Sequence, residues 1–463
     1  MLFQNRLVSN KLHIIIVGCG KVGRTLTEQL SSEGHELTLI DQQAHRIQEI
    51  TNLYDVMGIV GNGANFSIQK EAGVKDADLL IAVTESDELN LLCCTIARQV
   101  ANCAAIARVR NPDYSREVGY LQEKLGLALV INPELEAAKE TARILYLPTA
   151  LEITSFAHGQ AELVQFKVPA GNVLCDMTVA HLGKHITNNI LICAIERSDE
   201  VHIPTGEFLI KAGDIISFIS TPKEARHFLV EIGFNPRQVR NTMIIGGGKA
   251  TYYLAYQLIK AGIEVKIIEK DFHRCEELSI LLPDAIIING DGTDPELLRE
   301  AGIESVESFV PLTGIDEENI MLTLHAKQVS SAKVITKINR ISFTDAINQL
   351  DLGSVIYPKY ITSEAIIAYV RAKSASKESL NIETLYHMFD QQVEVIEFRV
   401  STNSKVIGIP LKDLSLRKNL LIACIVRNGR TIIPTGLDDI QADDRVIVVT
   451  TKTGLGAIES IVK

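Results

Sequence analysis

The sequence predicts an α/β chain made of two copies of one unit, each with a large doubly wound lobe on a parallel sheet and a small mixed α/β lobe after it. Three observations predict this fold class: a repeat with a nearly constant offset, strand-sized apolar strings that alternate with helical patterns, and a glycine-rich turn near the start of each copy. A chain of 463 residues is too long for one hydrophobic core. Strings of Ile, Val and Leu are typical of parallel strands that are buried on both faces.

The repeat is carried by short matching stretches along the whole chain. Gly18 matches Gly246, 228 residues later, and Gly206 matches Gly436, 230 residues later. The other matches are Gly61-Asn-Gly63 with Gly290-Asp-Gly292, Glu71-Ala-Gly73 with Glu300-Ala-Gly302, and Thr84 to Asn90 with Thr313 to Asn319. Because one offset holds across both lobes, the whole unit is duplicated.

Changes of pattern divide the chain into four expected domains. Strands and helices alternate in the large lobes, whereas short strands with glycine turns follow Pro148. Asn132-Pro133-Glu134 predicts the cap and first turn of a connecting helix, and hinges between lobes are expected near Pro133 and Pro358. The expected domains are two Rossmann-type lobes over 11–135 and 239–360, and two small C-terminal lobes over 150–232 and 380–463.

The first large lobe carries the fingerprint of a dinucleotide-binding turn. An apolar strand leads into Gly18-Cys19-Gly20-Lys21-Val22-Gly23, an amphipathic helix follows, and Asp41 ends the next strand. The three glycines permit a tight turn, close approach of a pyrophosphate, and close packing of helix on strand. The helix N-terminus offers N–H groups to phosphates. Asp41 can accept both ribose hydroxyls and would repel a 2′-phosphate, which disfavours NADP.

Two other interpretations of this turn are open. A glycine-rich turn can be purely structural and bind nothing. Gly18 to Thr25 is also one residue away from a P-loop, with Arg24 in place of the lysine that reaches the β- and γ-phosphates. Because an acid such as Asp41 has no place in a P-loop, the sequence favours the dinucleotide fingerprint.

The second copy keeps most of this pattern and is expected to be the weaker site. Its turn is Gly246-Gly247-Gly248-Lys249-Ala250, but Thr251 replaces the third glycine and is expected to push branched bulk between helix and strand. Glu269 stands in the place of Asp41 and keeps a ribose contact possible. The second site is therefore expected either to bind a nucleotide or to serve packing alone.

Polar residues at the ends of later strands complete the candidate site. Thr84 and Glu85 follow the fourth strand, at the edge where such sheets bind ligands. Asp87 is expected to cap the next helix. Arg108 ends the fifth strand and is expected either to balance phosphate charge or to be a solvated strand end. In the second copy, Thr313 and Lys337 stand in the places of Thr84 and Arg108, and Asp291 of the Gly290-Asp-Gly292 stretch is a further candidate.

Composition excludes several classes of protein. The net charge of -11 speaks against a nucleic-acid partner. No apolar run reaches the roughly 18 residues of a membrane span, and the N-terminus lacks a signal-peptide core, so a cytoplasmic protein is expected. The eight cysteines form no C-x-x-C pair and the eleven histidines show no ligand spacing. We expect buried, reduced cysteines and no metal site.

No catalytic constellation accompanies the glycine turns. A dehydrogenase needs a general acid or base beside the nicotinamide, whereas the small lobes hold only the isolated histidines His181, His185 and His202. Both copies keep the fold glycines and candidate nucleotide contacts while their reactive residues differ. The sequence therefore favours a binding and signalling module over an enzyme, with an NAD-dependent oxidoreductase as the alternative.

The chain resembles proteins with tandem regulator-of-potassium-conductance (RCK) domains, and more narrowly the TrkA family of cytosolic subunits in bacterial Trk potassium uptake systems. The resemblance rests on Val17 to Gly23, Asp41, Glu71-Ala-Gly73, Asp76-Ala-Asp78, Thr84 to Asn90, Ala107 to Tyr114 and the two Pro-Thr-Gly turns. A short N-terminal extension and Thr251 depart from the family pattern, which places the second site in question.

The resemblance implies a function that composition and spacing do not reach. It implies binding of NAD(H), ATP or ADP, and assembly as a homo-oligomeric ring, a homotetramer. It also implies a peripheral position on the inner face of the cell membrane, under a potassium-conducting membrane subunit of the Trk type. A regulatory subunit of a potassium/proton antiporter is an alternative within the same class.

Overall fold

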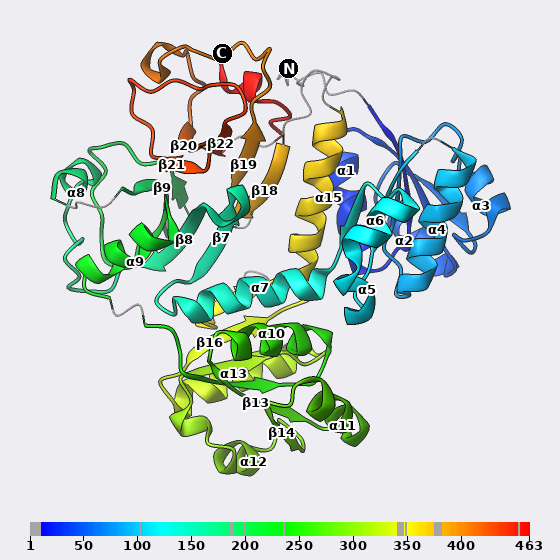
Figure 1. The fold of residues 1–463 in the computed structure, drawn as a ribbon, viewed down its shortest axis with the longest axis horizontal. Coiled ribbons are helices and arrows are strands. Elements are labelled where there is room, and N and C mark those ends of the chain that lie inside the picture. Colours follow the sequence, from blue (N-terminus) through cyan, green and yellow to red (C-terminus); the bar gives the residue numbers. More distant parts are fainter. Residues whose placement is uncertain are drawn as a thin grey trace. The chain divides into compact units, whose positions relative to one another are not determined.

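The computed structural model describes residues 11–101, 103–185, 189–198, 200–234, 237–339, 347, 350–374, 382–389, 391–451 and 454–463 (Figure 1). The chain forms two compact units. The first unit is Met1–Glu136 with Pro358–Leu380, and the second is Ala137–Tyr357 with Asn381–Lys463. The division thus falls within α7 (Pro133–Tyr146) and at the start of α15 (Pro358–Ser374).

The first large lobe is a parallel sheet of order β3-β2-β1-β4-β5-β6, the order of the Rossmann fold. Its strands are β1 (His13–Val17), β2 (Glu36–Asp41), β3 (Met57–Val60), β4 (Leu79–Ala82), β5 (Ala104–Arg108) and β6 (Leu129–Ile131). Its helices are α1 (Lys21–Ser32), α2 (Ala44–Thr51), α3 (Phe66–Glu71), α4 (Asp87–Val100), α5 (Pro112–Arg116) and α6 (Val118–Leu125). Since β1 and β4 are central and buried on both faces, they read as unbroken apolar strings.

The second large lobe repeats this topology with the order β14-β13-β12-β15-β16-β17. Its strands are β12 (Asn241–Ile245), β13 (Glu264–Glu269), β14 (Ile286–Asn289), β15 (Ser308–Pro311), β16 (Lys333–Lys337) and β17 (Ser354–Ile356). Its helices include α10 (Lys249–Lys260), α11 (Phe272–Leu281), α12 (Pro295–Glu300) and α13 (Asp316–Val329). The predicted tandem duplication and doubly wound fold class are confirmed.

Each small lobe is a five-stranded antiparallel sheet, with the orders β10-β9-β11-β8-β7 and β18-β19-β22-β20-β21. The first comprises β7 (Glu152–Phe156), β8 (Ala161–Lys167), β9 (Leu191–Arg197), β10 (Glu200–His202) and β11 (Ile215–Ser220), with α8 (Val179–His185) and α9 (Pro222–Glu231). The second comprises β18 (Ile382–Met388), β19 (Val393–Arg399), β20 (Leu420–Arg427), β21 (Arg430–Ile432) and β22 (Arg445–Thr450).

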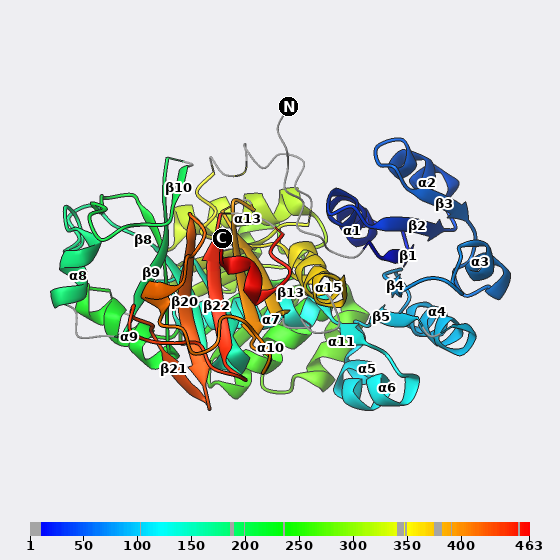
Figure 2. The same cartoon turned by 90° about the horizontal axis from the view of Figure 1, so that it is seen from above.

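The two small sheets belong to the same compact unit and share one hydrophobic core. Phe156, Leu163 and Cys193 of the first sheet are buried together with Val395 and Val449 of the second. β20 lies against β9 and β11, as Figure 2 shows for β9 and β20. The two repeats of the small lobe therefore pack on one another within the chain.

Helix α15 follows the second large lobe in sequence but packs on the first. It lies along α1 (Figure 1). The Nε and Nη2 atoms of Arg371 donate to Glu33 Oε1 at 2.8 and 2.6 Å. Only 8% of the Arg371 side chain is exposed, so the pair is largely withdrawn from solvent. A guanidinium–carboxylate pair of this kind is costly to break from one side, because it leaves a buried charge without a partner.

Most of the cysteines lie in the interior of the protein, as predicted. All eight cysteines are free thiols, seven of them buried and Cys175 half-buried. The described residues contain no cluster of three potential metal ligands. Within the same residues, no helix is long and apolar enough to cross a bilayer.

Candidate nucleotide-binding site

The first glycine turn has the steric requirements that its three glycines suggest. Gly18 has φ +103°, and a Cβ there would lie 2.9 Å from the Thr84 nitrogen. A Cβ on Gly23 would lie 1.9 Å from the Gly18 carbonyl oxygen, so only glycine allows α1 to pack this close to β1. Around Gly20, by contrast, no heavy atom beyond its immediate chain neighbours lies within 4 Å of an added Cβ. The backbone at Gly20 is therefore open to a ligand.

The helix that follows the turn begins without a side-chain cap. Gly20 is the N-cap residue of α1, no side chain accepts from the first-turn amides, and the first turn holds no acid. Lys21 is exposed there, whereas Val22 is buried against the lobe. α4 is different, since Ser86 caps it and acids occupy its first turn. The N–H groups at the start of α1 thus remain available for an anion.

Asp41 at the end of β2 is bonded to the glycine turn itself. Its Oδ2 accepts from the Cys19 amide at 2.7 Å and its Oδ1 accepts from the Gln43 amide at 2.8 Å. A carboxylate offers about four acceptor positions, so capacity remains for ribose hydroxyls. Burial raises the pKa of the Cys19 thiol to about 12, which leaves that side chain an inert part of the turn.

A buried amide holds together the strand ends beside the turn. The Asn90 side-chain oxygen accepts from the Thr84 amide at 2.8 Å and from the Thr84 hydroxyl at 2.6 Å, while its Nδ2 donates to the Arg108 carbonyl at 2.9 Å. Asn90 is completely buried. It fixes the ends of β4 and β5 relative to one another, at the edge where such sheets bind ligands.

The sequence did not single out Asn90 as part of the site. The available signal was its recurrence as Asn319 in the second copy. There its side-chain oxygen accepts from the Thr313 amide at 3.0 Å and its Nδ2 donates to the Lys337 carbonyl at 3.0 Å. A polar residue that recurs in a buried helix position indicates a shared hydrogen-bonding task.

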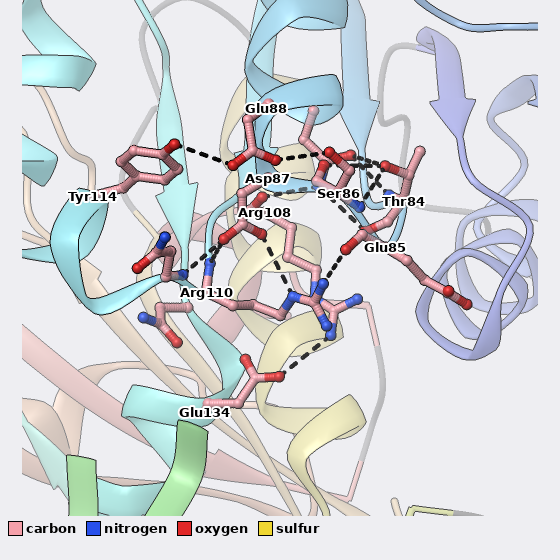
Figure 3. A network of polar contacts seen from close by, with 12 residues as sticks. Thr84, Glu85, Ser86, Asp87, Glu88, Arg108, Arg110, Tyr114 and Glu134 are labelled. Atoms are coloured by element: carbon pink, nitrogen blue, oxygen red, sulfur yellow. Dashed lines mark hydrogen bonds and ion pairs between the residues drawn. The ribbon is translucent and has the colours of Figure 1, made fainter. Parts of the chain in front are cut away.

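The prediction that Asp87 caps α4 is wrong, because Ser86 is the N-cap and Asp87 is the first helical residue. The Asp87 carboxylate instead accepts from the amides of Arg110 and Asn111 at 2.8 and 2.7 Å (Figure 3). It thereby ties the segment after β5 to the start of α4. The side chain of Glu85 is exposed, and its backbone carbonyl accepts from the Arg110 guanidinium.

Arg108 is not a solvated strand end. Its side chain is 15% exposed, and its Nη2 lies 3.6 Å from Glu134 Oε1 at the start of α7 (Figure 3). Burial lowers the pKa of Arg108, against the raising effect of the Glu134 charge. A guanidinium keeps its proton even so, and Arg108 is a partly buried cation at the carboxyl edge of the sheet.

The second copy reproduces the geometry of the turn, with Thr251 in place of the third glycine. Gly246 has φ +95°, the Gly247 amide donates to Glu269, and Gly248 is the N-cap residue of α10, which has no side-chain cap. Thr251 does bring bulk into the position of the third glycine. Its hydroxyl is accommodated there by a 2.6 Å hydrogen bond to the Gly246 carbonyl.

The remaining candidates of the second copy have local partners. Lys249 is exposed and Ala250 half-buried at the start of α10. Asp291 accepts from the amide and hydroxyl of Thr293, and the first of these bonds is the main cause that lowers its pKa. Lys337 donates from Nζ to the Leu312 carbonyl at 3.1 Å. The candidates of each copy thus lie at the carboxyl edge of its own large sheet.

The sheet order, the open helix N-terminus and the acid at the end of the second strand define a tandem protein of the Rossmann fold class. The family models for the TrkA-N domain and the TrkA-C domain each match twice, over residues 14–133 and 242–358 and over residues 163–233 and 395–463. The chain belongs to the TrkA family.

Relatives of similar length support this membership. The chain is 30% identical over 455 residues to the Trk system potassium uptake protein TrkA of Haemophilus influenzae, covering 97% of this chain and 98% of that protein. It is 31% identical over 450 residues to a Trk system potassium uptake protein TrkA homolog of Archaeoglobus fulgidus, covering 97% and 100%. Among solved structures, the GsuK RCK domain aligns with a TM-score of 0.63 at 18% identity, over 97% of this chain and 94% of that one.

Proposed function

We propose that this chain is a nucleotide-sensing regulatory subunit of a potassium-conducting membrane uptake system of the Trk type. The observation that carries the proposal is the glycine turn of the first copy. Its open Gly20 backbone and the uncapped start of α1 lie beside Asp41, which is bonded to the same turn. The relatives named as Trk potassium uptake proteins supply the physiological setting.

The ligand we propose is NAD(H), ATP or ADP. Each of these ligands carries an adenosine ribose and a diphosphate. When bound, it would contribute negative charge and a pair of ribose hydroxyls to the site, and would not itself be converted. The first-turn amides of α1 would bind the phosphates, and Asp41 would accept from the ribose hydroxyls. We assign the stronger site to the first copy, because Thr251 fills the corresponding glycine position of the second.

We further propose that the chain binds nucleotide without turning it over. Beside the glycine turns, the described residues offer a buried thiol at Cys19 and tightly bonded acids, not a paired acid and base facing an open space. Purified protein should return NADH and ATP unchanged over hours. Sustained hydride transfer or phosphate release that disappears in Gly20→Ala would support the oxidoreductase or hydrolase alternative instead.

Regulation requires a partner and two states. A nucleotide can shift a conformational equilibrium only by binding one state more tightly than the other. We propose that the chain acts as a homo-oligomeric ring, a homotetramer, peripheral on the inner face of the cell membrane and bound to the potassium-conducting subunit. Its acidic charge disfavours direct adsorption to anionic lipid, so the membrane subunit would recruit it.

Three measurements test this function. Calorimetric titration with NAD, NADH, ATP and ADP should give binding that Asp41→Ala weakens. Deletion of the gene should reduce potassium uptake and growth at low potassium, and the wild-type gene should restore both. In membranes that lack the potassium-conducting subunit, the chain should remain in the supernatant after fractionation. If the chain pellets with bare lipid, or if potassium flux does not depend on it, the regulatory function is wrong.

A further inference from the structure

We propose that Arg108 and Glu134 form a latch that nucleotide phosphates open. In this proposal, phosphates bound at the first glycine turn compete with Glu134 for Arg108, and the start of α7 loses its ion pair when they succeed. The inference rests on the proposed function and deepens it, because it names the step by which occupancy of the site is passed along the chain.

The latch lies at the edge of the sheet where the proposed ligand would bind. Arg108 is the last residue of β5, and Glu134 is the second residue of α7, directly after the neighbouring strand β6. The glycine turn leaves β1, and only β4 separates β1 from β5. At a strand spacing of about 4.8 Å, the turn and Arg108 are about 10 Å apart along this edge. A diphosphate on the turn therefore lies within the range of an arginine side chain.

The ion pair between Arg108 and Glu134 is long, although both side chains are largely buried. Its Nη2–Oε1 distance is 3.6 Å, whereas charge-assisted hydrogen bonds are about 2.7–2.9 Å. Arg108 Nε and Glu134 Oε2 are buried without a hydrogen-bond partner among the described residues. Arg197 shows the contrast, since it donates to both oxygens of Asp214 at 2.7 Å. Arg108 is thus a cation with unused donors, which a phosphate could engage more fully than Glu134 does.

Glu134 lies in α7 close to the point in the sequence where the first compact unit ends and the second begins. The residues of α7 up to Glu136 belong to the first compact unit, and those from Ala137 onward belong to the second. Asn132 caps the helix by accepting from the Leu135 amide at 3.0 Å, and Glu134 adds the ion pair to Arg108. Withdrawal of Arg108 therefore weakens the attachment of a helix that continues into the other unit.

The second copy carries two cations at the positions of the latch residues. Lys337 occupies the position of Arg108, and Lys359 occupies the position of Glu134, as the second residue of α15. Two cations cannot form an ion pair with one another. The second copy thus supplies a matched control position for the experiment.

The test is a double-mutant cycle with ADP as the probe. Glu134→Gln removes the competitor for Arg108 and should tighten ADP binding by about threefold to tenfold, the range for a partly buried ion pair. In an Arg108→Gln background the same Glu134→Gln change should alter the affinity little. Lys359→Gln, in the second copy, should leave it unchanged. An ordinary structural defect would weaken binding, so tighter binding separates the latch from a loss of stability.

Amide hydrogen exchange reports the second half of the proposal. ADP should speed exchange in the first turns of α7 in the wild type, and Glu134→Gln should show that faster exchange before ADP is added. If wild-type protein binds neither ADP nor NAD, the proposed function is wrong. If it binds ADP while Glu134→Gln is unchanged or weaker, or while exchange in α7 does not respond, the latch is overturned and the proposed function stands.

Discussion

Asp41 accepts the Cys19 amide hydrogen at 2.7 Å, and Glu269 forms the corresponding bond to Gly247 in the second copy. The acid that would contact the ribose is therefore also the residue that shapes the glycine turn. On the proposed function, binding of ribose and placement of the glycine turn would be coupled through one carboxylate in each copy.

Asp41→Ala should weaken binding of NAD and of ADP alike, by about 1.5–3 kcal/mol, the value of a hydrogen bond to a charged group. Both ligands share the ribose, so the losses should be similar. Titration calorimetry measures them, with Glu269→Ala as the matched variant. The ranking of the two sites is wrong if Glu269→Ala abolishes binding and Asp41→Ala leaves it intact.

Two glycine substitutions should separate binding from folding. Gly20→Ala places a methyl group in open space, so the thermal unfolding midpoint should stay close to that of the wild type while nucleotide binding is lost. Gly23→Ala forces a Cβ against the Gly18 carbonyl at 1.9 Å, and overpacking of this kind costs about 1–3 kcal/mol. Thermal unfolding and titration of both variants check this. Equal stability of the two would contradict the close packing of α1 on β1.

Asn90→Ala should destabilise the first large lobe, because it leaves the Thr84 amide and the Arg108 carbonyl without their side-chain partner. The expected loss is about 1–3 kcal/mol for each buried group left unsatisfied. Asn319→Ala removes the equivalent bonds and should cost a similar amount. Nucleotide affinity should fall more in Asn90→Ala than in Asn319→Ala. If the two variants bind nucleotide with equal affinity under conditions in which both are fully folded, the role of Asn90 is purely structural.

The buried carboxyl of Glu397 should make stability depend on pH. Burial raises its pKa above the ordinary 4.5, against the lowering effect of its bonds from Ala157 and Thr384. The folded protein then holds a proton that the unfolded chain has released. The free energy of unfolding should therefore decrease as pH rises from about 4.5 through the folded-state pKa.

Glu397→Gln is the matched variant for this pH dependence. It places at this position the residue that the equivalent strand β8 carries as Gln165, and it cannot titrate. Unfolding midpoints of the two proteins between pH 4 and 7 should diverge, with the wild type losing stability relative to the variant as pH rises. Glu162, whose pKa burial also raises, titrates in both proteins and cancels in the comparison. Parallel curves would contradict the prediction.

Local signals were enough to predict the large lobes. The turn at Gly18, the acid at Asp41 and the glycine that ends the first helix lie within one βαβ unit, and the structure has Gly34 at φ +86° just after α1. Each of these residues is dictated by backbone geometry in its own neighbourhood. The constant offset then extended the prediction to the second copy.

Contacts between distant segments could not be predicted in the same way. Arg371 and Glu33 are 338 residues apart, and in sequence each is an ordinary charged residue near a helix end. The shared core of the small sheets likewise joins Cys193 to Val395, which alternation of apolar residues cannot pair. Asn90 could not be assigned to the site from its own segment, because an amide within an amphipathic helix has no local signature of burial. Tertiary partners, rather than residue type, decide all three.

The docking of α15 on α1 has a consequence for synthesis of the chain on the ribosome. The last strand of the first large lobe ends at Ile131, but α15 is complete only at Ser374, 243 residues later. At roughly 5–20 residues per second, translation of that interval takes about 12–50 s. During this time the nascent lobe presents the uncovered flank of α1 to chaperones and to neighbouring nascent chains. The first domain to leave the ribosome is thus among the last to be finished.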